Sequence, residues 1–157
     1  MDAVITIEVM NDLKRFLEEN IQNVRLSTKE NTNKVPSVVL GYLDPLQEER
    51  EEKDDFPYIL IRCLEGSEDE ESSIRLKIIF GIYSEDVKGW MDVLHLIQVV
   101  KLAILKKKIF EFYSVITPLK FSIPEEQPYP YFFGFMDVSF EVPHIEMEGM
   151  VNAWQAE

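Results

Sequence analysis

The sequence predicts an α+β fold: a mostly antiparallel sheet of about five strands, with an N-terminal helix and one long helix packed on one face. Apolar residues recur with the helical period of about 3.6 in two segments, and alternate or run together in the segments between. The predicted strands come in groups, which favours antiparallel pairing. The 157 residues have the length of one domain, and no linker divides them.

The first helix is expected from about Ala3 to Val24, because one of its sides is apolar and the other is charged. The apolar side consists of Ile5, Val9, Met10, Leu13, Phe16, Leu17, Ile21 and Val24. Residues 27–34 are polar and are predicted to form a loop. A strand is then expected over about residues 38–43, ending at Asp44-Pro45.

Two further strands, Tyr58–Leu64 and Ile74–Tyr83, are predicted to form a long hairpin. The second strand alternates apolar and polar residues, as a strand with one core face does. Two acidic segments, 47–55 (QEEREEKDD) and 65–73 (EGSEDEESS), lack apolar periodicity. Both are therefore predicted to be solvated, mobile loops, the second forming the tip of the hairpin.

The long helix is expected to begin at Ser84-Glu85-Asp86, a capping residue followed by acids, and to end near Lys106–Lys108. Two strands should follow, over residues 110–123 and 131–142, joined by the proline-rich segment PEEQPYP. Residues 1–145 are thus predicted to form a single domain. Residues 146–157 are predicted to form a flexible or docking tail, in which Trp154 is the candidate docking residue.

Charge and composition exclude several functions. The chain carries 16 basic and 29 acidic residues, a net charge of −13, so its surface should repel nucleic-acid phosphates rather than bind them. The single cysteine, Cys63, cannot form an internal disulfide, which fits a reducing cytoplasm, and its apolar neighbours predict a buried side chain. The longest apolar stretch, residues 90–105, is short and interrupted by polar residues, so no membrane span is expected.

No catalytic signature is present, and no enzyme activity, cofactor or metal is expected. The sequence lacks a nucleophile elbow, a phosphate-binding loop and a zinc-binding HExxH motif. Asp92 and His95, three residues apart on the long helix, would suit a metal pair or a general base. Base rates favour two polar residues on the less buried side of the helix. The acidic segments lack the ligand spacing of a calcium loop.

The long helix has more apolar residues than one core face requires. The expected core side consists of Trp90, Val93, Leu94, Ile97, Val100, Ile104 and Leu105. Met91, Val99 and Leu102 lie on the other side, with His95 among them. Either another part of the domain covers this side, or another subunit does. These four residues, Met91, His95, Val99 and Leu102, are the candidate subunit interface.

The order of elements and several short motifs resemble those of tail terminator (tail completion) proteins of long-tailed phages and prophages, the lambda-like minor tail protein U family. The motifs are Phe56-Pro57-Tyr58, Gly81-Ile82-Tyr83 leading through Ser84-Glu85-Asp86 into the long helix, Gln127-Pro128-Tyr129-Pro130, Tyr131-Phe132-Phe133-Gly134 and Val142-Pro143-His144-Ile145. The resemblance covers roughly Met1 to Ile145 and includes no catalytic residue.

The resemblance implies a structural protein that forms an oligomeric ring, commonly a hexamer, on the last ring of the tail tube. Its partners would be copies of itself, the tail tube protein and a head-completion or neck protein, with DNA passing through unbound. It would assemble in the host bacterial cytoplasm and then belong to the virion tail. The acidic loops would face the tube or the lumen through Glu51, Glu52, Asp54, Glu68, Asp69 and Glu70.

Other functions stay open at this stage. A neck or head–tail connector, or another minor tail subunit, would have similar sequence features. A small acidic monomeric binding or inhibitor protein would instead be a stable monomer with a basic partner. An enzyme would require a pocket lined by Asp92, His95 or a carboxylate cluster.

Overall fold

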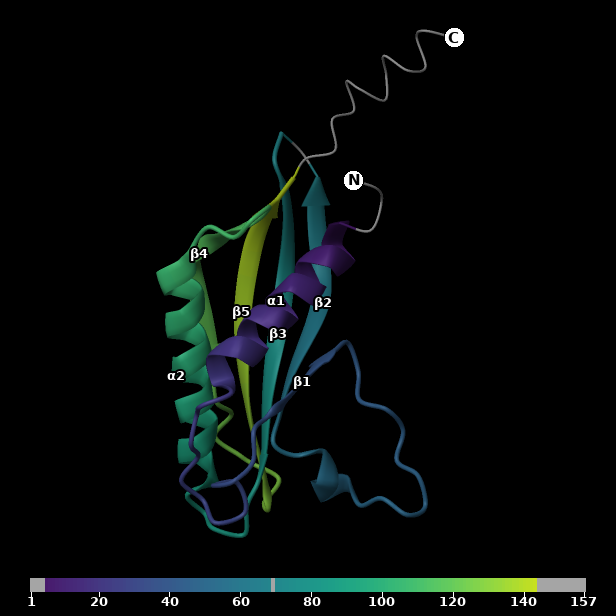
Figure 1. The fold of residues 1–157 in the computed structure, drawn as a ribbon, viewed down its shortest axis with the longest axis vertical. Helices are drawn as coiled ribbons and strands as arrows, with labels where there is room; N and C mark the ends of the chain where they lie inside the picture. The colour runs from purple at the N-terminus through teal and green to yellow at the C-terminus, as the bar shows by residue number, and fades with distance from the viewer. Residues whose placement is uncertain (1–4, 69, 144–157) are drawn as a thin grey trace, which may run out of the picture.

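The computed structural model describes residues 5–68 and 70–143, and these form an α+β fold (Figure 1). The elements in chain order are α1 (Ile5–Ile21), β1 (Ser37–Leu40), the 3-10 helix η1 (Glu52–Asp55), β2 (Tyr58–Glu68), β3 (Ser72–Tyr83), α2 (Gly89–Lys107), β4 (Ser114–Ser122) and β5 (Tyr131–Val142). The sequence-based prediction of a mostly antiparallel sheet with an N-terminal helix and one long helix is confirmed.

The five strands of the sheet lie in the order β1-β2-β3-β5-β4. β2, β3, β5 and β4 pair antiparallel, whereas β1 runs parallel to β2, with Ser37 opposite Tyr58. β3 is the central strand: it pairs along its whole length with β5, from Ser72 opposite Val142 to Tyr83 opposite Tyr131. The chain therefore returns to the middle of the sheet with its last described strand.

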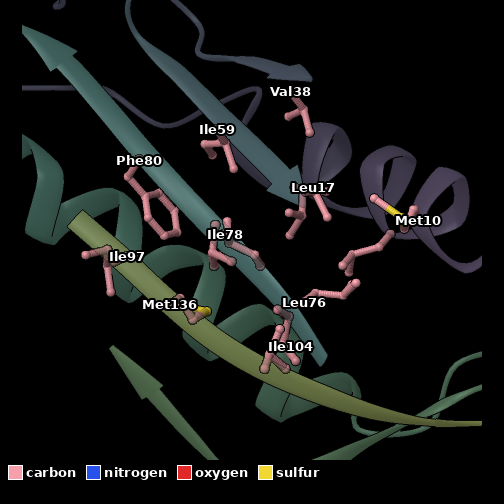
Figure 2. Packing of buried hydrophobic residues seen from close by; sticks show 14 of the residues in the cluster. Met10, Leu17, Val38, Ile59, Leu76, Ile78, Phe80, Ile97, Ile104 and Met136 are labelled. Carbon is pink, nitrogen blue, oxygen red and sulfur yellow. The ribbon is translucent and has the colours of Figure 1, made fainter. Parts of the chain in front are cut away.

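Both described helices cover the same face of the sheet and enclose the main core. α1 lies over β1 and beside α2, and α2 lies over β3, β5 and β4. Figure 2 shows side chains from both helices and four strands pointing toward one another, among them Leu17, Ile78 and Ile104. Burial of these apolar side chains, at about 25 cal/mol per Å², is the main favourable term in folding.

A second, smaller apolar cluster lies on the opposite face of the sheet. Phe56, Tyr58 and Leu60 are buried there, with Tyr131 and Phe133 packed beside them. A Cβ on Gly81 would lie 2.7 Å from the Tyr58 ring, so the absence of a side chain at this position makes room for the cluster. The sequence pattern predicted a core face on only one side of the sheet and did not reveal this cluster. In β2, residues 58–61 are all buried, so this strand is covered on both faces.

Several predicted element bounds, and the loop assigned to each acidic segment, differ from the structure. β2 extends into the acidic segment 65–73 and ends at Glu68, and β3 begins within the same segment at Ser72. Most of the predicted loop is therefore paired strand. The other acidic segment, 47–55, contains η1, which is closed by a capping box between Glu51 and Asp54. α2 begins at Gly89 rather than at Ser84, because residues 84–88 form turns that fasten the helix to the preceding loop.

Candidate interaction surfaces

Asp92 is a buried structural residue, contrary to its expected place on the less buried side of α2. Its side chain is only 1% exposed. Its carboxylate accepts hydrogen bonds from the backbone N–H of Ser27 at 2.7 Å, from that of Thr28 at 3.1 Å and from the Thr28 hydroxyl. Four lone-pair sites on a carboxylate accommodate three donors, which offsets the cost of burying the charge. Asp92 thus fixes the loop after α1 to the start of α2.

His95 is exposed, one turn after Asp92. The three donors to Asp92 come from the 27–28 segment, so the structure supplies no Asp92–His95 hydrogen bond of the kind that would orient a general base. The Asp92–His95 pair is therefore not built as an acid–base site. In the described ranges, 5–68 and 70–143, no group of three His, Cys, Asp or Glu side chains could hold a metal ion.

A second anchor holds the same loop at the residue expected to cap α2. Ser84 is fully buried; its hydroxyl donates to Glu30 Oε1 at 3.1 Å and accepts from the Asp86 N–H at 3.0 Å. The Glu85 N–H donates to Glu30 Oε2 at 2.7 Å. Burial alone would raise the pKa of Glu30, but the hydrogen bonds from Glu85 and Ser84 lower it below its ordinary value. Ser84 therefore acts in a loop anchor and not as a helix cap.

The outer face of α2 carries exposed apolar side chains. Met91, in the first turn of α2, is 47% exposed, and Leu102, farther along the helix, is 61% exposed. His95 lies on the same side and is also exposed. Helical spacing places Met91, His95 and Leu102 along one stripe, directed away from the sheet. Of the candidate interface, these three residues share one solvent-facing surface.

Val99, the fourth candidate interface residue, packs against the main core and is only partly exposed. It lies between the exposed stripe and the buried side of the helix, so its apolar character is explained by the domain itself. Conversely, Trp90 was expected in the core and is 47% exposed, while Leu96 is fully buried and was not among the expected core residues. The buried side of α2 thus includes Leu96 and Asp92 and is rotated about the helix axis relative to the predicted core side.

The two acidic segments lie in different parts of the molecule. Figure 1 shows the β2–β3 hairpin tip at one end and the segment between β1 and β2 looping out at the side of the sheet. Glu68 and Glu70 are exposed at the tip, and Glu51, Glu52 and Asp54 are exposed in and beside η1. Asp69 and Trp154 lie outside the described residues. The acids therefore do not make one continuous surface.

The segment 42–55 combines exposed apolar side chains with acids. Tyr42 is 71% exposed and Leu46 is 52% exposed. The Arg62 guanidinium lies over the Tyr42 ring, 4.0 Å from its centroid, and the Arg62 Nε–H donates to the Gly41 carbonyl at 3.0 Å. Arg50 forms an ion pair with Asp55 at 3.2 Å. The first contact holds Tyr42 beside β2, and the ion pair joins two residues within the segment.

Cys63 is exposed, which corrects the expectation of a buried thiol. Its partner across the ladder, Leu76, is fully buried. β1 ends opposite Ile61, so no neighbouring strand flanks Cys63 on the outer side of β2. Burial of Cys63 was predicted from its apolar neighbours in the sequence. Those neighbours do not show that β1, the flanking strand, ends before it reaches Cys63.

The hollow at the hairpin tip does not have the lining of a catalytic site. It has a volume of about 410 Å³, lies beside the end of β5 and is open to solvent. Its carboxylates are those of Glu70, Glu71, Glu111 and Glu141. A binding or catalytic pocket is usually an apolar cavity in which a few polar groups point toward the ligand. This hollow is instead open and lined by several carboxylates.

Comparison with known proteins adds no identity. No family model matches the chain, and no curated protein matches it either. None of the described helices is long and apolar enough to cross a membrane. The resemblance to tail terminator proteins stays a prediction from the sequence.

Proposed function

We propose that this protein is a structural subunit of a phage or prophage tail. It assembles with further copies into a ring that caps the tail tube and contributes to head–tail joining. The observation that carries the proposal is the outer face of α2, where Met91 and Leu102 are exposed on a helix that is apolar on most sides. A helix of that composition is usually buried on more than one side, which points to a further subunit.

The order of elements supports the proposal. The resemblance to tail terminators rests on an N-terminal helix, a strand, a hairpin, a long helix and two final strands, and the fold has these elements in that order. The proposal includes the partners that the resemblance implies: the tail tube protein and a head-completion or neck protein. It also includes assembly in the host bacterial cytoplasm followed by residence in the virion tail.

The acidic hairpin tip is the part that we assign to the tube or the lumen. Glu68, Glu70 and Glu71 are exposed at or beside the end of the longest hairpin. A negative wall does not retain the DNA phosphates that pass along it. The acids of the 42–55 segment lie elsewhere on the molecule and need a separate explanation.

Electron microscopy of the purified protein, alone and mixed with isolated tail tubes, tests the proposal. Rings, or tube ends closed by added density, are expected for the unaltered chain. Leu102→Asp should abolish capping while leaving the fold intact, whereas Ile7→Asp, a change at an equally exposed apolar position on α1, should not. A monomer that ignores tubes would overturn the proposal and favour a small acidic binding protein. Binding to the neck protein with no affinity for tubes would favour a connector.

A further inference from the structure

We infer that the outer face of α2 binds the 42–55 segment of a second copy of this chain, so that copies associate head to tail. The inference deepens the proposed function, and it rests on that function for the claim that copies assemble. It identifies the two surfaces that meet and the chemistry that matches them.

The outer face of α2 is apolar with a positive rim. Met91 and Leu102 provide the exposed apolar surface. Between Val87 and Phe110 the sequence contains five lysines and a single acid, Asp92, whose carboxylate is buried. In a chain with net charge −13 this is a local excess of positive charge. Lys106 lies on the same side of the helix as Leu102, by helical spacing, and is exposed.

The 42–55 segment is apolar with a negative rim. Tyr42 and Leu46 are exposed, and residues 44–55 contain seven acids against two bases, a net charge of −5. Arg62 already covers one side of the Tyr42 ring, which leaves the ring as a fixed, outward aromatic surface. Aromatic side chains that are held in place before binding are frequent anchors of protein interfaces, because little side-chain entropy is lost on binding. The two surfaces match in apolar content and are opposite in charge.

The two surfaces lie on opposite sides of the molecule. α2 packs over β3, β5 and β4, while the 42–55 segment connects β1 to β2 at the other end of the strand order β1-β2-β3-β5-β4. Figure 1 shows α2 along one side and this segment looping out on the other. Two different, complementary patches on opposite sides give a heterologous contact, which closes into a ring when the rotation between copies permits.

The edges of the sheet are poorly suited to the alternative of strand-to-strand association. The edge strand β1 has four residues. The other edge strand, β4, contains Pro118, and its register with β5 shifts between Ile116 and Lys120. Short strands, prolines and register shifts are features that oppose pairing with another chain. The complementary α2 and 42–55 surfaces therefore remain the better contact.

A mixing experiment tests the inference without tail tubes. Leu102→Asp blocks the α2 face and Leu46→Asp blocks the segment, each at an exposed position where the fold should tolerate an acid. Sedimentation velocity at about 0.1 mM, where an interface of micromolar Kd is saturated, should give an oligomer for the unaltered chain. Each variant alone should be monomeric at that concentration, which requires its micromolar contact to be weakened about 1,000-fold or more. An equimolar mixture should form a heterodimer, because one intact pair of surfaces remains between the two variants.

The outcomes separate this contact from others. Ile7→Asp, the matched control, should assemble like the unaltered chain. Raising sodium chloride from about 0.05 M to 0.5 M should weaken assembly, because the charges that meet are screened. Oligomers of the Leu46→Asp variant, or a mixture that remains monomeric, would overturn the inference. An unaltered chain that is monomeric at 0.1 mM would also overturn it, whereas capping of tubes by that monomer would leave the proposed function standing. Oligomers built through both surfaces that ignore tubes would support the inference and overturn the tail assignment.

Discussion

The Asp92 carboxylate and Thr28 are joined by two hydrogen bonds, although 64 residues separate them in the sequence. Asp92 comes from the first turn of α2 and Thr28 from the loop that follows α1. Asn31 extends the connection, donating to the Thr28 hydroxyl at 2.6 Å and to the Tyr83 carbonyl at 2.9 Å. This network joins the loop after α1, the end of β3 and the start of α2.

Asp92→Ala should destabilise the protein by roughly 3 kcal/mol, because the change leaves two buried donors of Thr28 and the partly buried N–H of Ser27 without their acceptor. Urea unfolding followed by circular dichroism measures the difference. His95→Ala, an exposed position on the same helix, is the control and should change the free energy of unfolding by less than about 0.5 kcal/mol. Equal effects of the two changes would contradict a structural role specific to Asp92.

Gly134→Ala should destabilise the contact between β5 and α2. A Cβ at Gly134 would lie 2.6 Å from Val93 Cγ1 and 2.7 Å from Ile97 Cδ1, both in fully buried side chains. Overpacking of this kind costs about 1–3 kcal/mol. At Gly66 the nearest atom would be 3.5 Å away, so Gly66→Ala is the matched control in another strand. Thermal unfolding of both variants tests the prediction, and a stable Gly134→Ala protein would show that α2 can shift outward without cost.

Glu30 should make the stability depend on pH in the acid range. Its folded pKa is lowered, so the unfolded chain, with a glutamate pKa of about 4.3, binds its proton more readily than the folded chain does. The stabilisation is complete above about pH 5 and is lost as the pH falls through the folded pKa. The difference in Tm between the unaltered chain and Glu30→Gln should therefore shrink between pH 6 and pH 3. A Tm difference that stays constant across this range would contradict the role of the Glu30 carboxylate.

Cys63 should react with a maleimide in the folded protein. Its thiol is exposed, and reaction of a thiol requires access as well as the thiolate. One equivalent of label per chain is expected without denaturant, at a rate within about tenfold of that in urea. Labelling that appears only on unfolding would place the thiol inside the protein and contradict the fold at the end of β1.

The sequence predicted the fold class and most of the elements because both depend on local patterns. The apolar periodicity of α1 and the alternation of β3 identified their core faces directly. The parallel direction of β1 was not predicted, because it depends on the path of residues 41–57, which has no periodic signal. Asp92 was assigned to the wrong side of α2 because its partners, Ser27 and Thr28, are distant in sequence.

The candidate interface on α2 was predicted in part, because it too depends on a local pattern. Met91, His95 and Leu102 follow from helical spacing, and the structure places all three on the exposed side of α2. Val99 has the same apolar character but packs on the core, and spacing alone cannot distinguish the margin of a buried side from an exposed stripe. The exposed Tyr42 was missed because it was predicted within a strand over residues 38–43, whereas β1 ends at Leu40. Leu46 was missed because a loop carries no pattern that separates its outward residues.

The place of β5 between β3 and β4 has a consequence for folding on the ribosome. β3 pairs with β5 over a separation of up to 70 residues, and β4 has no strand partner in the sheet other than β5 among the described residues. Until residues 131–142 have left the exit tunnel, β3 lacks the strand that pairs beside it, and α2 lacks one of the strands on which its buried side packs. Contacts so distant in sequence also slow folding. Nascent chains should therefore expose Ile78 and Phe80 from the time these residues emerge until β5 has followed them, and binding by a chaperone during that interval would protect them.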